Sequence, residues 1–404
     1  MKKHNPIIPM KGVCDPHIHI FNGKAYLYAS HDDSIDNKSW FMSDWQIWSS
    51  DDLMNWKYES TIYPEDTYIG KSNECWAVDA AEHNGKFYYY FSNRNIDTGV
   101  AVSDNPCTNF RDALGKPLLS SELTPSLQYD PTVFVDDDKT PYLIWGLPNG
   151  NGYYISRLND DMISLAEEPR RILIDGGAAR DDKNFLHKKN GRYYLSWGSK
   201  YAISDNVYGP YSYIDNLAIS QDHGSFFSWN GQDFYAFTIF DPTKYYRSTG
   251  ICYVYYSEDG KMHADPMVAE YGVGIYDSQW SKINAIWYMK SKNVSKAENV
   301  WGDFDVCINN RSELYYPNIQ NTSGKTKLYF ELASVNDEVS YIEIFDGEKQ
   351  IGSCEIMKTS GYHHCGYEVF RCDVEVPDKE NINLTLKFKG NGGELMRLHW
   401  FRFV

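Results

Sequence analysis

Five aspartates recur at matching places in the first two thirds of the chain, each five to eight residues before a tight polar turn: Asp15, Asp79, Asp130, Asp182 and Asp222. If the segments that carry them meet in space, their carboxyl groups converge. Carboxylates that lie close together repel, which raises the pKa of some and leaves others ionised. This division provides one carboxylic acid that donates a proton and one carboxylate that activates water, the pair that glycoside hydrolysis requires.

A plainer role is open for each aspartate taken alone. Asp15 and Asp130 stand directly before a proline, a common place for a turn to begin. Aspartate side chains also satisfy backbone N–H groups at strand ends. The agreement between five separate segments favours convergence at a shared site.

The elements that would position these carboxyls follow from a repeated phrase, a polar turn between aromatic-rich runs. The turn occurs at 22–23, 84–85, 137–139, 190–191 and 230–231, four times as Asn-Gly. Asn-Gly between apolar runs indicates a β-hairpin, because both residues tolerate the positive φ of a type I′ turn. Five such hairpins suit five four-stranded sheets packed around an axis, since one sheet alone cannot bury both faces. The sequence therefore predicts an all-β chain with a five-bladed β-propeller over 1–285 as its catalytic domain.

The repeated phrase stops near residue 285. Strands with alternating apolar and polar residues replace it at 327–333, 340–345, 383–388 and 398–403, separated by polar turns such as Asp346-Gly347. This pattern predicts an antiparallel, jelly-roll-like β-sandwich over 286–404.

Composition narrows the classes of partner. The 404-residue chain has a formal net charge of −16, with 55 acidic against 39 basic residues. Nucleic acids and anionic membranes bind clustered Lys and Arg, so neither is expected as a partner. The first residues lack the apolar stretch of a secretory signal, so a cytoplasmic location is expected, or secretion if a signal was trimmed. The eight cysteines form no C-x-x-C pair and are expected to be free thiols.

The motifs around the first three aspartates, at 14–18, 76–79 and 129–134, resemble glycoside hydrolase family 43, in particular its arabinofuranosidase and xylosidase branch. The resemblance covers roughly residues 5–270. The segments 387–390 and 399–403 resemble a family 6 carbohydrate-binding module, so the sandwich is expected to be carbohydrate-binding-module-like.

The resemblance implies three catalytic roles. Asp15 matches the general base of an inverting displacement, and Asp130 matches the carboxylate that raises the pKa of the acid and orients it. The general acid of the family is usually a Glu, but Asp182 occupies its register here. Three outcomes are open: Asp182 acts as the acid, Asp181 or Glu74 replaces it, or the domain only binds sugar.

Further residues are expected to bind substrate. Trp76 and Trp40 would offer apolar walls to a sugar ring. Arg247 matches a residue that touches substrate in relatives, and its guanidinium suits sugar hydroxyls or the orientation of a carboxyl. His223 matches a histidine near the axis, where a structural Ca²⁺ is an open alternative to a hydrogen-bonded core histidine. In the sandwich, Tyr362 is the aromatic residue to test.

The expected activity is exo-acting hydrolysis that releases terminal pentose from plant-type oligosaccharides, first α-L-arabinofuranosyl and next β-xylosyl, with no cofactor required. The alternatives are a galactosidase on the same framework and a non-catalytic carbohydrate-binding protein. A third reading takes Asp15, His17 and His19 as metal ligands of an amidohydrolase, which would need an alternation of strands and helices that the sequence does not display. A homo-oligomer is left open.

Overall fold

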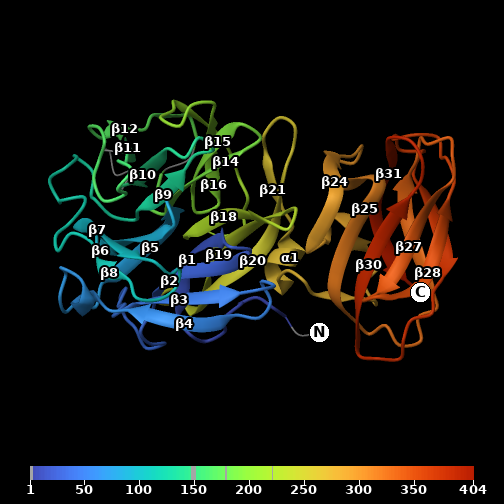
Figure 1. Cartoon of the computed structure of the whole chain (residues 1–404), viewed down its shortest axis with the longest axis horizontal. Helices are drawn as coiled ribbons and strands as arrows, with labels where there is room; N and C mark the ends of the chain where they lie inside the picture. Colours follow the sequence, from blue (N-terminus) through green and yellow to red (C-terminus); the bar gives the residue numbers. More distant parts are fainter. Residues whose placement is uncertain (1–2, 147–151, 178–179, 221) are drawn as a thin grey trace.

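The computed structural model describes residues 3–146, 152–177, 180–220 and 222–404, and within them the chain is nearly all β (Figure 1). Five small sheets follow one another along the chain, each formed by strands close in sequence. Their innermost strands, β1, β5, β9, β14 and β18, lie next to one another in a ring that closes between β18 and β1. This is the predicted five-bladed β-propeller.

The first two blades are regular antiparallel sheets with strands in sequence order. Blade one contains β1 (Val13–Phe21), β2 (Lys24–His31), β3 (Trp45–Ser50) and β4 (Lys57–Ile62). A short 3₁₀ helix, η1 (Pro64–Asp66), leads to blade two, which contains β5 (Cys75–His83), β6 (Lys86–Asn93), β7 (Asp97–Ser103) and β8 (Arg111–Asp112).

The remaining blades keep this order, and one of them gains a strand. Blade three contains β9 (Thr132–Val135), β10 (Pro141–Trp145), β11 (Tyr154–Arg157) and β12 (Arg170–Arg171). Blade four contains β14 (Asn184–Lys189), β15 (Arg192–Trp197), β16 (Lys200–Ser204) and β17 (Tyr211–Asn216), with β13 (Ile174–Asp175) added parallel to β17. Blade five contains β18 (Gly224–Trp229), β19 (Gln232–Thr243), β20 (Tyr246–Tyr256) and β21 (Met262–Ala264).

The predicted hairpins join the innermost strand of each blade to the next. At the four Asn-Gly turns both residues have positive φ, for example 52° at Asn84 and 75° at Gly85. Type I′ geometry matches the right-handed twist of the flanking strands, which explains why this dipeptide recurs. Large aromatic side chains fill the interior, and Trp45, Trp145 and Trp197 are almost completely buried.

A second domain follows the propeller, and the two lie side by side in Figure 1. Its sheet runs in the order β28-β27-β30-β25-β31-β26-β29, and a bridge between Gly352 and Val374 brings its two ends together. The strands are β24 (Lys290–Glu298), β25 (Phe304–Gln320), β26 (Lys327–Ala333), β27 (Ser340–Asp346), β28 (Lys349–Ile356), β29 (Glu368–Asp373), β30 (Asn381–Lys389) and β31 (Glu394–Phe403). The predicted antiparallel sandwich is therefore present, as a nearly closed, barrel-like sheet.

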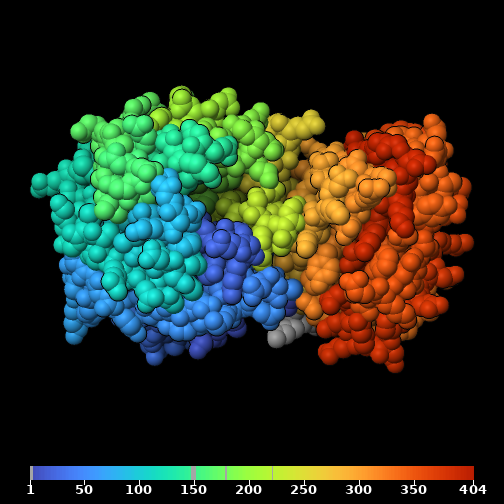
Figure 2. Space-filling model, in the orientation of Figure 1, coloured from blue at the N-terminus to red at the C-terminus, as the bar shows by residue number. Residues whose placement is uncertain are grey.

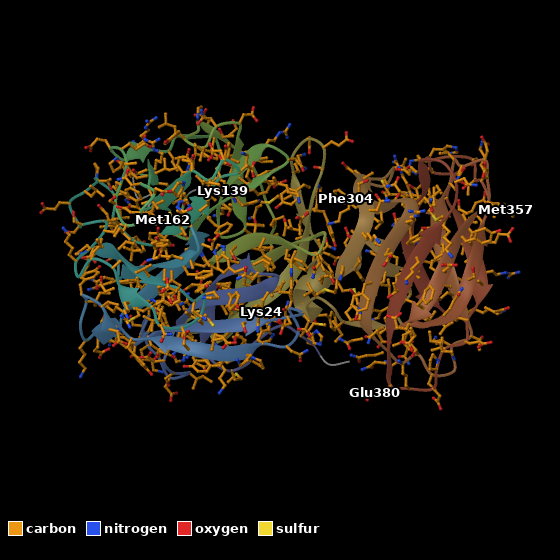
Figure 3. The ribbon with its side chains drawn as sticks, viewed as in Figure 1. Lys24, Lys139, Met162, Phe304, Met357 and Glu380 are labelled. Carbon is orange, nitrogen blue, oxygen red and sulfur yellow. The ribbon has the colours of Figure 1, made fainter. Side chains whose placement is uncertain are left out.

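The junction between the domains is packed. Between them come α1 (Pro266–Tyr271), β22 (Tyr276–Asp277), β23 (Ile283–Asn284) and a 3₁₀ turn, η2 (Ala285–Trp287). Strands β22 and β23 already pair with β25 and β31 of the sandwich. Phe304, labelled in Figure 3, packs its ring against Tyr255 and His263 of blade five.

Helix α1 is the one α-helix among the described residues, and the strand–helix alternation of an amidohydrolase is therefore missing from them. Six residues are too short to produce a helical periodicity in the sequence, although Asp265 caps the first turn by accepting from the N–H groups of Met267 and Val268. Within the described ranges, no helix has the length and apolar character needed to cross a bilayer. Figure 2 shows that the propeller surface is hollowed where blue, green and yellow-green segments meet.

Candidate active site

One pocket of about 430 Å³ is lined by all seven residues that the sequence singled out for catalysis or substrate binding: Asp15, Trp40, Trp76, Asp130, Asp182, His223 and Arg247. They come from all five blades or from the segments that lead into and between their strands. The ring of blades thus brings together groups up to 232 residues apart in sequence.

Local backbone geometry aims two of the carboxyls. Asp15 and Asp130 have φ of 52° and 51°, the left-handed region that asparagine and aspartate tolerate better than most residues. The register of β1 shifts between Cys14 and His17, so Asp15 lies at an irregularity of the strand. The N–H of Asp15 donates to Thr238 Oγ1 at 3.1 Å, a hydrogen bond that connects this part of β1 to blade five.

Asp15 is held as a carboxylate. Arg247 donates to both of its oxygens, at 2.6 and 3.1 Å, and His223 Nδ1 lies 3.0 Å from Oδ1. Burial raises the pKa of Asp15, but Arg247 and His223 outweigh it and lower the pKa to about 2. An ionised carboxylate at neutral pH suits a group that accepts a proton from water.

Arg247 organises this charge cluster. The side chain is 3% exposed, and besides Asp15 it binds Asp32 through Nε and Nη2, each at 3.0 Å, and Asp222 through Nη1 at 3.1 Å. Its guanidinium lies 4.7 Å from the ring centre of Trp40. Because each of its three nitrogens donates to a carboxylate, Arg247 positions the charges of the pocket, the second of the two roles weighed from the sequence.

His223 links two of the proposed catalytic carboxyls. Its Nδ1 faces Asp15 and also lies 3.2 Å from Asp222 Oδ1, while its Nε2 lies 3.2 Å from Asp130 Oδ2. Burial lowers the pKa of His223, but Asp15 and Asp130 raise it well above its ordinary value. The ring thus lies between carboxylates that favour its protonated form.

The surroundings of His223 bear on whether a cation could bind there. Asp15, Asp222 and His223 each offer one atom within 4.8 Å of the others, so the donors are present, but as arranged they pair with one another and with Arg247. The calcium ion expected beside His223 therefore stays a prediction.

Asp182 lies in a different electrostatic environment from Asp15. Tyr129 donates its hydroxyl to Oδ2 at 2.9 Å, and Lys183 Nζ lies 3.4 Å from Oδ1. Burial and the neighbouring Asp130 carboxylate raise the pKa of Asp182 to about 7, against which Lys183 and His223 act only in part. At neutral pH and below, this group holds a proton that it can donate.

The two alternative acids are placed less favourably. Asp181 lines the pocket, but Lys183 binds it at 3.0 Å and its pKa is lowered, because the charge of Lys183 and its hydrogen bonds outweigh the effect of burial. Glu74 pairs with Arg94 at 3.2 Å and is not part of the pocket lining.

The expectation that all five repeated aspartates share the site was wrong for Asp79. The other four precede their turns by seven or eight residues, whereas Asp79 precedes its turn by five. Two or three residues at about 3.3 Å each place it roughly 7–10 Å further along the strand. The residues of blade two at the corresponding distance, Trp76 and Ala77, do line the pocket.

The apolar part of the pocket comes from aromatic rings. Trp76 packs against Tyr129 at 6.1 Å between ring centres, and Trp40 packs edge-on against Tyr245 at 4.7 Å. Phe240, which is 48% exposed, and Lys244 complete the lining on the side of blade five. A sugar ring could pack against such walls while its hydroxyls face the carboxyls.

Several lining or supporting residues escaped the sequence reasoning, among them Asp32, Tyr129, Lys183 and Phe240. Tyr129 and Lys183 adjoin Asp130 and Asp182, so sequence proximity to an aspartate was the available signal. Asp32 ends a segment, 30–32, that also resembles family 43, but no role was assigned to it. Phe240 lies outside the repeated phrase and carried no signal.

Comparisons with known proteins agree with this geometry. A model of glycosyl hydrolases family 43 matches residues 3–262. A xylosidase/arabinosidase of Bacteroides ovatus is 28% identical over 316 residues, covering 63% of this chain and 95% of that protein. Xylosidase/arabinosidase 43A of Humicola insolens is 29% identical over 325 residues, covering 64% of this chain and 98% of that protein.

A solved structure extends the likeness of fold to the whole chain. The family 43 arabinoxylan arabinofuranohydrolase of Bacillus subtilis, crystallised with cellotetraose, aligns with a TM-score of 0.58 at 21% identity. The alignment covers 100% of this chain and 97% of that one. With the propeller, the carboxyl-lined pocket and a family match over more than half of its residues, this chain belongs to glycosyl hydrolases family 43.

Proposed function

We propose that this glycoside hydrolase removes terminal pentose units from plant-type oligosaccharides with inversion at the anomeric carbon. The proposed preferred unit is α-L-arabinofuranosyl, and β-xylosyl is the second choice. One observation carries the chemistry: a single pocket holds a carboxylate with a pKa of about 2 and a carboxyl with a pKa of about 7. The names of the two similar xylosidase/arabinosidases support a pentose substrate.

In this mechanism Asp15 takes a proton from water as the water attacks the anomeric carbon. Asp182 donates its proton to the leaving glycosidic oxygen, and Asp130 raises the pKa of Asp182 until that transfer. His223 and Arg247 keep Asp15 ionised and oriented. The aspartate is one methylene shorter than the glutamate usual in the family, so the Tyr129 hydrogen bond to Asp182 gains importance in aiming the acid.

Each catalytic group acts without a metal ion in this proposal. A pocket of this size, closed by aromatic rings, accommodates a terminal unit better than the middle of a long chain, which favours exo action. For the sandwich domain we propose glycan binding, with Tyr362 as the residue to test; Arg397 covers one face of its ring at 4.1 Å. Binding of the whole protein to insoluble arabinoxylan should weaken in Tyr362→Ala.

The activity is tested with a panel of nitrophenyl α-L-arabinofuranoside, β-xyloside and galactosides, using the wild-type protein, Asp15→Asn and Asp182→Asn. Asparagine is the suitable replacement at position 15 because it tolerates the positive φ there. We expect the arabinofuranoside to be cleaved fastest and Asp15→Asn to lose at least about a hundredfold in kcat/KM. Asp182→Asn should lose less on these substrates, because a nitrophenolate departs with little help from an acid. Proton NMR of the first product should reveal the inverted anomer. Binding of sugar without cleavage of any substrate would support the non-catalytic alternative, and fastest cleavage of a galactoside would support the galactosidase.

A further inference from the structure

Two histidines and an aspartate meet inside the propeller, outside the lining of the catalytic pocket. His17 Nδ1 lies 2.9 Å and His19 Nε2 lies 2.6 Å from Asp79 Oδ1. The histidines are two residues apart on β1, so they share one face of the strand, and Asp79 comes from the neighbouring β5. Each of the three residues offers one ligand atom, and these atoms all lie within 4.8 Å of one another.

The carboxylate of this cluster is completely buried and firmly oriented. The N–H of Ala80 donates to Oδ1 at 2.8 Å, and the N–H of Val133 donates to Oδ2 at 2.9 Å. A buried carboxylate of this kind requires a positive partner, which is either a proton on an imidazole or a cation.

The orientation of His17 favours a cation. Its side chain is 2% exposed, and its Nδ1 is a buried nitrogen without a hydrogen bond of acceptable geometry, although Asp79 Oδ1 is only 2.9 Å away. Such an unpartnered nitrogen is costly in a protein interior unless another group binds it. A metal ion placed among the three ligand atoms would satisfy it.

We propose that His17 Nδ1, His19 Nε2 and the Asp79 carboxylate bind one divalent transition-metal ion of the zinc class. Two imidazoles and one carboxylate form a donor set that suits Zn²⁺, with water as a fourth ligand. Tetrahedral bonds of about 2.0 Å place ligand atoms about 3.3 Å apart, so the side chains need to separate by only several tenths of an ångström. The backbone hydrogen bonds to Asp79 would then orient a metal ligand, as outer-shell contacts commonly do.

The consequence is structural. The ion would join β1, which contains Asp15, to β5, which contains Trp76. None of its three ligands lines the catalytic pocket, so no step of the hydrolysis passes through it. Binding only to the folded protein, it would raise the free energy of unfolding and hold two walls of the pocket in register.

The experiment measures metal directly. The full-length protein is stripped with a chelator, dialysed against a small excess of ZnCl₂, freed of unbound ion and analysed by mass spectrometry of its metal content. We expect one Zn²⁺ per chain and a rise in Tm in the wild type, with both lost in His19→Gln and in His17→Gln. Co²⁺ should give the intense visible absorption of a four-coordinate site in the wild type but not in His17→Gln or His19→Gln.

A matched control is available on β5. His83 forms a similar pair with Asp160, 2.7 Å apart, but lies outside the cluster, so His83→Gln should bind Zn²⁺ like the wild type. Circular dichroism confirms that each variant is folded, and the exposed part of His19 makes His19→Gln the milder change. The inference is overturned if the wild type retains no Zn²⁺, or if the folded His19→Gln variant retains as much as the wild type. These readouts do not depend on turnover and so remain separate from the proposed function.

Discussion

The substitution Asp182→Asn should make the protein more stable while it abolishes the proposed acid. The pKa of Asp182 rises from an ordinary value of 3.8 to about 7, because burial and Asp130 disfavour its charged form. At about 1.36 kcal/mol per unit, a shift of roughly three units corresponds to about 4 kcal/mol against the folded state once both states are ionised. The side chain of Asp182 is 26% exposed and Lys183 lies near it, and both reduce this effect. We therefore expect Asp182→Asn to raise the free energy of unfolding by about 2–4 kcal/mol.

The pH dependence identifies the cause. Below about pH 3.8 the Asp182 carboxyl is protonated in both the folded and the unfolded state, so the wild type and Asp182→Asn should differ little in stability. Between that pH and about 7 the unfolded state releases its proton first, so the wild type loses stability relative to Asp182→Asn as the pH rises. Above about pH 7 the difference is complete and constant.

Thermal unfolding of both proteins from pH 4 to pH 8 provides the assay. We expect Asp182→Asn to unfold roughly 2–5 °C higher at pH 8, with a gap that closes toward pH 4. Asp181→Asn is the matched control: the pKa of Asp181 is lowered, so its replacement should bring no gain at high pH. A gap that is independent of pH, or a variant less stable than the wild type at pH 8, would refute the reasoning.

Three further predictions concern the same pocket. The profile of kcat/KM against pH should be bell-shaped and fall about tenfold per pH unit above pH 7, because Asp182 then loses its proton. Its acidic limb should lie well below pH 4, because Asp15 stays ionised down to its pKa of about 2. A plateau of kcat/KM extending to pH 9 would contradict this. Arg247→Met should lower the free energy of unfolding in urea by about 3–5 kcal/mol, because it removes the guanidinium that pairs with the buried Asp15, Asp32 and Asp222. An unchanged midpoint would show that these pairs contribute nothing. Trp76→Ala should raise KM about tenfold with little change in kcat, because the ring of Trp76 lines the pocket and takes no part in the chemical step. An unaltered KM would show that Trp76 does not contribute to substrate binding.

The fold was largely predictable because its signals are local. Each Asn-Gly turn requires positive φ at both residues, and a sequence that repeats such a turn between aromatic runs has few other structures open to it. The alternating strands of the second domain are local patterns as well. Helix α1 was not foreseen, because six residues cannot display a helical period.

The candidate site was predictable only where spacing recurs. The distance from an aspartate to its turn placed Asp15, Asp130 and Asp182 in one pocket, and the same distance, applied strictly, would have excluded Asp79. The contacts that set the charges could not be derived this way, because they join different blades. Arg247 meets Asp32 across 215 residues, and such a pairing depends on side-chain reach within the closed ring.

The most direct test of the account compares leaving groups. If Asp182 donates the proton, its replacement matters little when the departing group is already a weak base. Asp182→Asn should therefore lose at least about a hundredfold more kcat/KM on an unactivated oligosaccharide than on a dinitrophenyl glycoside, whereas Asp15→Asn should lose equally on both. Equal losses by Asp182→Asn on the two substrates would contradict the assignment of acid and base on which the account depends.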